Sequence, residues 1–244
     1  MASPFQTAIV IGASSGIGEA LVRKLAAAGV RVAAVARRKA ELDRIAGECG
    51  GSMLTYAHDV RIFDEAPVLF DRIAGDLGSV DLFVYNSGVM PRLEEGEYNF
   101  AKDREMIEVN LLGAMAWLNP VAAYMEARRK GTLAGVSSVA GDRGRRGNPA
   151  YHTSKAALTT YMESLRNRVS RFGVEVVTIK PGPVATPMTL GLKLPLTIDA
   201  DRCATEMITA LEGGCGTTYV PAIWQPIMLA IQHVPSVIFR RTNI

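Results

Sequence analysis

Short apolar runs alternate along this chain with longer stretches in which apolar positions recur every three or four residues. An apolar run of roughly four to eight residues between turn formers is typical of a buried strand, and the wider spacing is typical of a helix. The runs predict strands over residues 7–11, 31–36, 53–58, 81–85, 133–136, 174–179 and 217–220. The wider spacing predicts helices over residues 16–28, 64–76, 102–129, 151–172 and 199–211, and a further polar helix through Leu42 and Ile45.

Glycine and proline support several of these helix boundaries. Gly29 and Gly131 follow the ends of two helices, where glycine is favoured because it adopts the left-handed backbone conformation easily. Pro67 falls in the first turn of the 64–76 helix, where its missing N–H is not needed. Pro120 stands inside the 102–129 helix and predicts a kink there.

The alternation of strands and helices predicts the fold class. Parallel strands can be joined only by crossover connections, and a helix usually forms each crossover. The chain shows no internal repeat, no low-complexity linker and no break in composition. We therefore expect a single doubly wound α/β domain over residues 1–244, with a mostly parallel seven-stranded sheet and helices on both faces.

Composition and charge narrow the class of protein. The 244 residues are 48% hydrophobic, and 27 basic against 24 acidic residues give a net charge of +3 that is spread along the chain. So weak a charge argues against nucleic acid or an anionic membrane as a partner. Cys49, Cys203 and Cys215 match neither a disulfide framework nor a metal-ligand spacing, and the N-terminus lacks the features of a secretory signal. We expect a cytoplasmic protein without a metal site.

Residues 219–239 are largely apolar, which raises the question of a membrane span. They contain Pro221, Pro226 and Pro235 together with polar side chains, and proline disrupts the interior of a helix. We therefore expect no spanning segment here, and packing in the core or between subunits instead.

A glycine-rich turn follows the first predicted strand. The sequence Gly12-Ala13-Ser14-Ser15-Gly16-Ile17-Gly18 lets the backbone turn tightly and approach a pyrophosphate, and the helix after it offers free N–H groups. The spacing is neither that of the common dinucleotide fingerprint nor that of a nucleoside triphosphate loop. A plain tight turn is the alternative, but the position at a strand–helix junction favours a dinucleotide site.

The second predicted strand ends on Ala36, followed by Arg37 and Arg38. In dinucleotide folds an acidic residue here accepts hydrogen bonds from the ribose hydroxyls of NAD, whereas arginine suits the 2′-phosphate of NADP. A solvated charge pair is the alternative, although cations at a helix N-terminus oppose the helix dipole. The sequence therefore favours NADP(H) over NAD(H).

Tyr151 and Lys155 are four residues apart in a predicted helix, so their side chains share one face. A free tyrosine has a pKa near 10 and is a poor acid–base catalyst at neutral pH. An ammonium group about 4 Å away would favour the phenolate by roughly 4 kcal/mol, or about three pH units. This spacing alone is common and carries little information.

The motifs are more specific as an ordered set than each is alone. That order is Gly12-x-x-x-Gly16-x-Gly18, Asn86-Ser87-Gly88, Asn110, Ser137-Ser138, Tyr151-x-x-x-Lys155 and Pro181-Gly182. The set resembles the short-chain dehydrogenase/reductase family over essentially the whole chain. The resemblance implies a Rossmann-type fold, a nicotinamide cofactor, a Ser-Tyr-Lys site assisted by an asparagine, and a homodimer or homotetramer.

The resemblance also implies a role for each matching residue. Tyr151 would be the general acid–base, and Ser138 would hold the substrate oxygen. Lys155 would lower the pKa of the tyrosine and bind the nicotinamide ribose, while Asn110 would support a water-linked proton relay. The cofactor contacts would be Gly12, Ser14, Ser15, Gly16, Ile17, Gly18, Arg37, Arg38, Asp59, Val60, Asn86, Gly88, Tyr151, Lys155, Pro181, Gly182, Val184 and Thr186.

Two positions depart from the family pattern. Tyr85-Asn86-Ser87-Gly88 replaces the usual Asn-Asn-Ala-Gly, and Ile11 replaces a frequent threonine. Neither change removes a catalytic group. We therefore expect the two departures to change local packing and not activity.

Several other side chains have two interpretations. His152 either lines the pocket or has a core or surface role, and the second is favoured. Loop arginines are more often solvated than bound to an anionic substrate, and apolar residues more often form core than line a substrate pocket. The arginines in question are Arg143, Arg145 and Arg146, and the apolar residues are Met188, Leu190, Leu192, Leu194 and Trp224.

These features predict an NADP(H)-dependent oxidoreductase that interconverts a carbonyl compound and an alcohol by hydride transfer. A catalytically silent NADP(H)-binding regulatory or scaffold protein is the alternative, and a turnover screen separates the two. An epimerase or dehydratase on this fold usually needs a larger substrate region than remains after Pro181.

Overall fold

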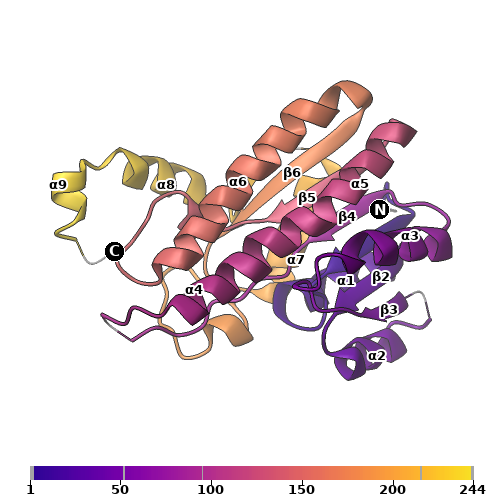
Figure 1. Cartoon of the computed structure of the whole chain (residues 1–244), viewed down its shortest axis with the longest axis horizontal. Helices are drawn as coiled ribbons and strands as arrows, with labels where there is room; N and C mark the ends of the chain where they lie inside the picture. Colours follow the sequence, from indigo (N-terminus) through magenta and orange to yellow (C-terminus); the bar gives the residue numbers. More distant parts are fainter. Residues whose placement is uncertain (1–2, 52, 95, 215, 243–244) are drawn as a thin grey trace.

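One parallel sheet forms the centre of the computed structural model, which describes residues 3–51, 53–94, 96–214 and 216–242 (Figure 1). The strand order is β3-β2-β1-β4-β5-β6-β9, and every neighbouring pair is parallel. The predicted doubly wound, seven-stranded sheet is confirmed. Its strands are β1 (Thr7–Ile11), β2 (Arg31–Ala36), β3 (Met53–Ala57), β4 (Leu82–Tyr85), β5 (Gly131–Val136), β6 (Val174–Pro181) and β9 (Thr217–Val220).

Helices cover both faces of this sheet and bury its apolar side chains. On one face, Leu21 and Leu25 share a core with Ile45 and Met207. The helices of that face are α1 (Gly16–Ala27), α2 (Lys39–Glu48) and α7 (Ala200–Glu212). The helices of the other face are α3 (Glu65–Leu77), α4 (Phe100–Ile107), α5 (Gly113–Arg128) and α6 (Pro149–Val169), and α4, α5 and α6 run diagonally across the front of Figure 1. Apolar residues alternate between the two faces along each strand because the pleat has a period of two.

The stretch predicted as one helix over residues 102–129 is divided. A π-helical turn over Glu108–Leu112 separates α4 from α5, and α5 continues through Pro120. Such a π-turn is a single turn inserted into an otherwise continuous helix, and the sequence analysis did not predict it. The irregular turn therefore lies at Asn110, well before the proline that led us to expect a kink.

The same helical stretch, Phe100–Arg128, is long and apolar enough to cross a membrane by length and composition alone. Half of its most apolar window is buried inside the protein. Trp117, Val121 and Met125 of this stretch pack in the core against α3 and α6. Its apolar character is therefore that of a core helix.

The C-terminal segment extends from one side of the molecule (Figure 1, yellow). It contains α8 (Trp224–His233) and α9 (Ser236–Phe239). Trp224 and Met228 are buried, but Leu229, Val237 and Ile238 are each more than half exposed. The expectation that residues 219–239 pack in the core is therefore only half right, because α8 buries one face against the protein and exposes the other. Packing between subunits stays a prediction.

Candidate active site

Functional side chains gather where the parallel strands end. The carboxyl ends of such strands meet at one edge of the sheet, which is where doubly wound folds bind ligands. The residues at or directly after these ends are Gly12, Ala36, His58, Asn86, Ser137 and Pro181. The sequence motifs, far apart in the chain, are thereby brought to one edge.

The glycine positions of the glycine-rich turn do not accommodate a side chain. Gly12 has a φ of +87° and Gly16 a φ of +57°, a region that L residues rarely adopt. A Cβ on Gly18 would lie 2.1 Å from the Gly12 carbonyl oxygen, which is backbone and cannot move aside. Asn86 Nδ2 donates to that same oxygen at 3.0 Å, so the end of β4 holds the turn in place. The turn thus presents bare backbone at the N-terminus of α1, where Ile17 is half-buried.

The two arginines after β2 differ in their surroundings. Arg38 lies on the glycine-rich turn: its Nη2 donates to Ser15 Oγ at 2.7 Å and to Ser14 Oγ at 3.0 Å. The Arg37 side chain is 54% exposed, and its only ion pair is a 4.0 Å contact with Asp59 in the described part of the chain. Arg38 therefore stabilises the turn, whereas the Arg37 side chain is exposed beside it and makes only the long contact with Asp59 among the described residues.

Asp59 and Val60 follow β3, as predicted, but their side chains already have partners. Arg61 Nη2 donates to Asp59 at 2.6 Å, and this guanidinium lowers the pKa of the carboxyl to about 2. Val60 is 6% exposed and packs against α5 at Gly113. A buried valine and an ionised carboxylate therefore border this end of the site.

Tyr151 and Lys155 lie in the first turns of α6, which begins two residues earlier than predicted, at Pro149. Proline is favoured there because the first N–H of a helix has no partner within it. Lys155 Nζ lies 5.8 Å from the centre of the Tyr151 ring and donates to the Val136 carbonyl at 2.9 Å. Ser138 stands just beyond the same strand end, and its Oγ accepts from Ala140 N at 3.0 Å.

The ionisation of the pair differs from the sequence expectation. Burial raises the pKa of Tyr151, and only the Ser138 hydroxyl acts to lower it. Burial also lowers the pKa of Lys155 from 10.5 to about 8. The Lys155 ammonium group, 5.8 Å from the centre of the Tyr151 ring, donates to the Val136 carbonyl. The environment instead weakens the charge of both groups.

Asn110 is fully buried in the π-turn and joins two segments of the site. Its Oδ1 accepts from Val89 N at 2.7 Å, and its Nδ2 donates to Val89 O and to Ser154 Oγ, both at 3.0 Å. Gly88 lies between the asparagine and the lysine: a Cβ there would be 3.4 Å from Lys155 Nζ. The asparagine side chain therefore fixes the segment after β4 against α6.

The loop after β6 closes the other side of the site. Gly182 donates to the Val220 carbonyl at 2.9 Å, and a Cβ on it would lie 2.0 Å from the indole nitrogen of Trp224. Val184 is buried in β7 (Val184–Ala185), which pairs with β8 (Ile198–Asp199). Thr186 contacts Gly16, because a Cβ there would be 3.1 Å from the threonine methyl group. The structure thus brings the predicted Pro181–Thr186 residues beside the glycine-rich turn.

A buried ion pair that the sequence analysis did not find anchors this region. Asp142 pairs with Lys180, and their side chains are 1% and 8% exposed. Tyr219 Oη donates to the other carboxylate oxygen at 2.9 Å. The three residues come from the loop before α6, from β6 and from β9, so they join the substrate-side loop to the sheet. No short spacing relates them, which is why a sequence motif could not reveal them.

We expect Asp142→Ala to lower the free energy of unfolding by about 3–5 kcal/mol, because Lys180 would keep a buried charge without a partner. Urea unfolding at pH 7 measures this loss. The matched control is Glu206→Ala, which removes a surface ion pair with Arg202 (2.9 Å) and should cost less than about 1 kcal/mol. Equal losses in both variants would show that the Asp142 network does not anchor the loop.

His152 holds the loop that connects Ser138 to Tyr151. One ring nitrogen lies 2.7 Å from the Ala140 carbonyl oxygen and the other 2.9 Å from that of Gly147. Burial is the largest effect on the imidazole and lowers its pKa. Of the two interpretations of His152, the structure supports the structural one: the ring links both ends of the loop.

Other sequence interpretations are settled by burial. Met188, Leu190, Leu192 and Leu194 are exposed on the loop after Thr186, so they are not core, whereas Trp224 is buried. Burial raises the pKa of the Cys203 thiol to about 12, in keeping with a packing role, and Cys215 lies outside the described residues.

No group of three or more histidine, cysteine or acidic side chains that could hold a metal ion occurs in the described ranges.

Comparison with known proteins assigns the chain to a family. The family model of the short chain dehydrogenases matches residues 6–194. An uncharacterized oxidoreductase of Myxococcus xanthus is 38% identical over 195 residues, covering 79% of this chain and 77% of the relative. The cis-4-hydroxycyclohexanecarboxylate dehydrogenase of Sinomonas cyclohexanicum is 31% identical over 209 residues, covering 84% and 83%. A solved short chain dehydrogenase/reductase family protein superposes with a TM-score of 0.78 at 25% identity, covering 89% and 95%.

The fold and the strand-edge site therefore define a Rossmann-like oxidoreductase. The chain belongs to the short-chain dehydrogenase/reductase family, which confirms the resemblance seen in the sequence.

Proposed function

We propose that this chain is an NADP(H)-dependent oxidoreductase that interconverts a carbonyl compound and an alcohol. One observation carries the proposal: Tyr151, Lys155 and Ser138 lie at the same sheet edge as the glycine-rich turn, whose Gly12 and Gly18 have no room for a Cβ. The similarity to a dehydrogenase that, by its name, acts on a hydroxylated ring carboxylate supports alcohol chemistry. We further propose that residues 1–244 act as one catalytic unit in a cytoplasmic homodimer or homotetramer.

The turn and its neighbours fit a dinucleotide. Bare backbone at Gly12, Gly16 and Gly18, at the N-terminus of α1, suits a pyrophosphate. The exposed Arg37 guanidinium, paired only at 4.0 Å with Asp59 among the described residues, could bind a 2′-phosphate, and Ala36 offers no carboxylate to repel it. The remaining contacts would come from Ser14, Ser15, Ile17, Arg38, Asp59, Val60, Asn86, Gly88, Tyr151, Lys155, Pro181, Gly182, Val184 and Thr186.

When bound, the nicotinamide group would supply or accept the hydride. The protein groups would manage the proton: Tyr151 gives it to the carbonyl oxygen during reduction and takes it back during oxidation. Because burial raises its pKa, the phenol is protonated at neutral pH and ready to donate. The Ser138 hydroxyl lies beside the phenol and would hold the substrate oxygen by a second hydrogen bond.

Lys155 and Asn110 would prepare the tyrosine for this transfer. A lysine whose pKa is about 8 can exchange a proton near neutral pH, so it can restore the proton that Tyr151 gives up. Asn110 fixes the segment at Val89 beside the lysine. The water-linked relay through Asn110 stays part of this proposal.

Cofactor preference tests the assignment of Arg37. A 2′-phosphate can meet a guanidinium through two parallel charge-assisted hydrogen bonds, and each contributes about 1.5–3 kcal/mol. We expect Arg37→Ala to weaken NADPH binding roughly ten- to a hundredfold and to leave NADH almost unchanged. Ala36→Asp should go further, since it repels the phosphate and offers an acceptor to the ribose hydroxyls. Fluorescence titration of both cofactors measures these effects.

Arg38→Ala is the matched comparison. This arginine holds the Ser14 and Ser15 side chains, so its loss should weaken both cofactors through the shared turn. The parent should prefer NADPH by at least about tenfold in kcat/KM. If Arg37→Ala lowered the affinity for both cofactors alike, Arg37 would be an ordinary surface charge.

A further inference from the structure

A cavity of about 540 Å³ lies between the loop before α6 and the C-terminal segment, outside the site described above. We call it the arginine cavity; its lining residues are Arg143, Gly144, Arg145, Arg146, Ser236, Phe239, Arg240 and Thr242. Four of them are arginines, and the described lining includes no aspartate or glutamate. The neighbouring Asp142 balances this charge only in part, because Lys180 and Tyr219 already occupy its two oxygens.

Arg143 builds the wall of the cavity. Its Nη1 donates to the carbonyl oxygens of Ile231 and Val234, both at 2.6 Å, at the C-terminal end of α8. Its guanidinium carbon lies 3.9 Å from the centre of the Phe239 ring. These contacts join the loop to α8 and α9. The Arg143 guanidinium is therefore engaged within the protein and is not counted among the anion ligands.

Arg145 carries a buried hydrogen-bond donor that is left unsatisfied among the described residues. Its Nε is buried and has no hydrogen-bond partner among the described residues, and its Nη2 reaches only the Met228 sulfur, at 3.5 Å. Burial lowers its pKa, and Asp142 only partly opposes this effect. A half-buried guanidinium with an unpaired N–H is costly unless an anion completes it.

Arg146 and Arg240 add two exposed charges at the mouth of the cavity. Neither makes a side-chain hydrogen bond or ion pair within the described ranges. Arginines that converge without a counter-charge repel one another, and the planar guanidinium matches the oxygens of a carboxylate or phosphate. Ser236 offers a further hydroxyl on the same wall.

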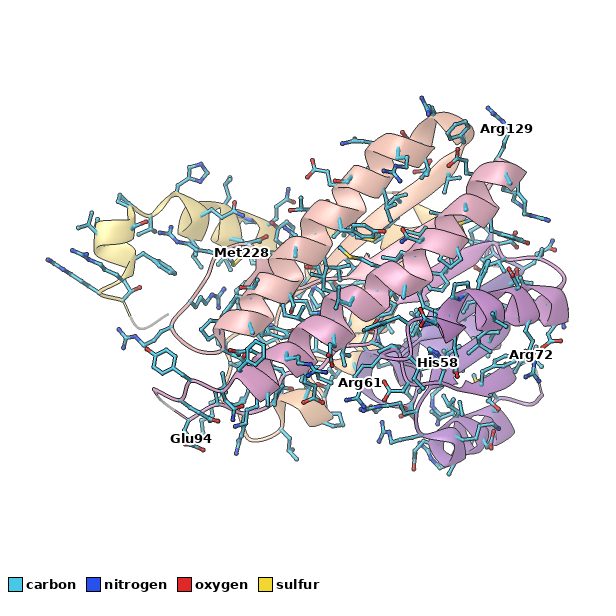
Figure 2. The ribbon with its side chains drawn as sticks, viewed as in Figure 1. His58, Arg61, Arg72, Glu94, Arg129 and Met228 are labelled. Atoms are coloured by element: carbon cyan, nitrogen blue, oxygen red, sulfur yellow. The ribbon has the colours of Figure 1, made fainter. Side chains whose placement is uncertain are left out.

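The arginine cavity is connected to the catalytic residues through packing. Met228, which contacts Arg145, lies in the middle of α8 on its buried side, next to the body of the protein (Figure 2). It shares a small core with Trp224 and with Val139, the neighbour of Ser138 in the chain. The loop that carries the arginines also leads directly into Tyr151.

We propose that the arginine cavity binds a carboxylate or phosphate group, with Arg145, Arg146 and Arg240 as its ligands. The assignment of that group to the substrate rests on the proposed function, whereas the anion site itself does not. If the bound group is part of the substrate, the substrate is a carbonyl compound or alcohol that carries a carboxylate or phosphate group away from its reacting carbon.

Calorimetric titration of inorganic phosphate into the whole chain, at constant ionic strength, tests the site without any turnover. Arg146→Gln and Arg240→Gln should each weaken phosphate binding about tenfold or more. Arg37→Ala reports any phosphate held at the dinucleotide turn, and binding should persist in it. The matched control is Arg171→Gln, an exposed arginine after α6 whose guanidinium lies over the Phe172 ring, and this variant should bind phosphate as the parent does. Absence of binding in the parent, or an equal loss in Arg146→Gln and Arg171→Gln, would overturn the proposal.

A pair of ketones, 4-acetylbenzoate and its methyl ester, identifies the source of the anion. If the group belongs to the substrate, the ratio of kcat/KM for the acid to that for the ester falls about tenfold in Arg146→Gln. An unchanged ratio in Arg146→Gln, when phosphate binds the parent and binds this variant more weakly, assigns the site to a separate anion. Phosphate binding without NADPH turnover of any carbonyl compound contradicts the proposed function and supports the anion site.

Discussion

Tyr151→Phe should lower turnover by a factor of about 10²–10⁴ and leave NADPH affinity within about threefold of the parent. The substitution keeps the ring, which packs at the start of α6, and removes only the hydroxyl that transfers the proton. The loss is therefore confined to the reaction step, and the steady-state kcat with a carbonyl substrate measures it. NADPH titration of the same sample shows whether the cofactor still binds.

Tyr161→Phe serves as the matched control for this variant. Tyr161 lies on the same helix, and its hydroxyl donates to Asn119 away from the catalytic edge. We expect turnover close to that of the parent. If Tyr151→Phe retained turnover within tenfold of the parent, Tyr151 would not be the acid–base group.

Lys155→Met should have the second largest effect, because it should damage cofactor affinity and turnover together. The lysine is 4% exposed, donates to the Val136 carbonyl and lies next to Gly88, and the family resemblance implies that it binds the nicotinamide ribose. Methionine fills a similar volume but carries neither donor nor charge. We expect a loss of about tenfold or more in each quantity.

Stability should not follow activity in this variant. Burial lowers the pKa of Lys155 from 10.5 to about 8, so the unfolded chain holds this proton more tightly than the folded protein. The buried charge therefore costs stability below pH 8, on the order of 3 kcal/mol, and the cost fades as the pH rises to 10.5. Lys155→Met should unfold at pH 7 in at least as much urea as the parent, and its stability should rise less between pH 8 and 10.

Unchanged affinity and unchanged turnover in Lys155→Met would show that the Tyr151–Lys155 spacing is a coincidence. Poor turnover that merely accompanies unfolding would instead assign the lysine a structural role. The urea measurement separates these two outcomes.

The fold could be predicted from the sequence because buried parallel strands leave a strong local signal. The seven predicted strands lie within two residues of the observed ones at each end. The signal is local: a run such as that of β1 is fully buried and made of apolar residues only from Ala8 onward. The tight turn at Gly12 and Gly18 could also be predicted from the sequence, since only glycine fits those backbone positions.

The features that escaped prediction depend on contacts between distant residues. The network of Asp142, Lys180 and Tyr219 joins three separate segments, and no spacing encodes it. The two arginines after β2 look equivalent in sequence, yet only Arg38 reaches the serines of the glycine turn. The spacing placed Lys155 on the same helical face as Tyr151 but could not show that its ammonium group donates to the Val136 carbonyl.

The most direct test of the account is NADPH oxidation by the purified chain across a panel of ketones and aldehydes, followed by absorbance. The account predicts turnover of at least one carbonyl class, with NADPH preferred to NADH by about tenfold or more in kcat/KM. Tight NADPH binding without turnover of any carbonyl compound in the panel would contradict it and favour a silent cofactor-binding protein.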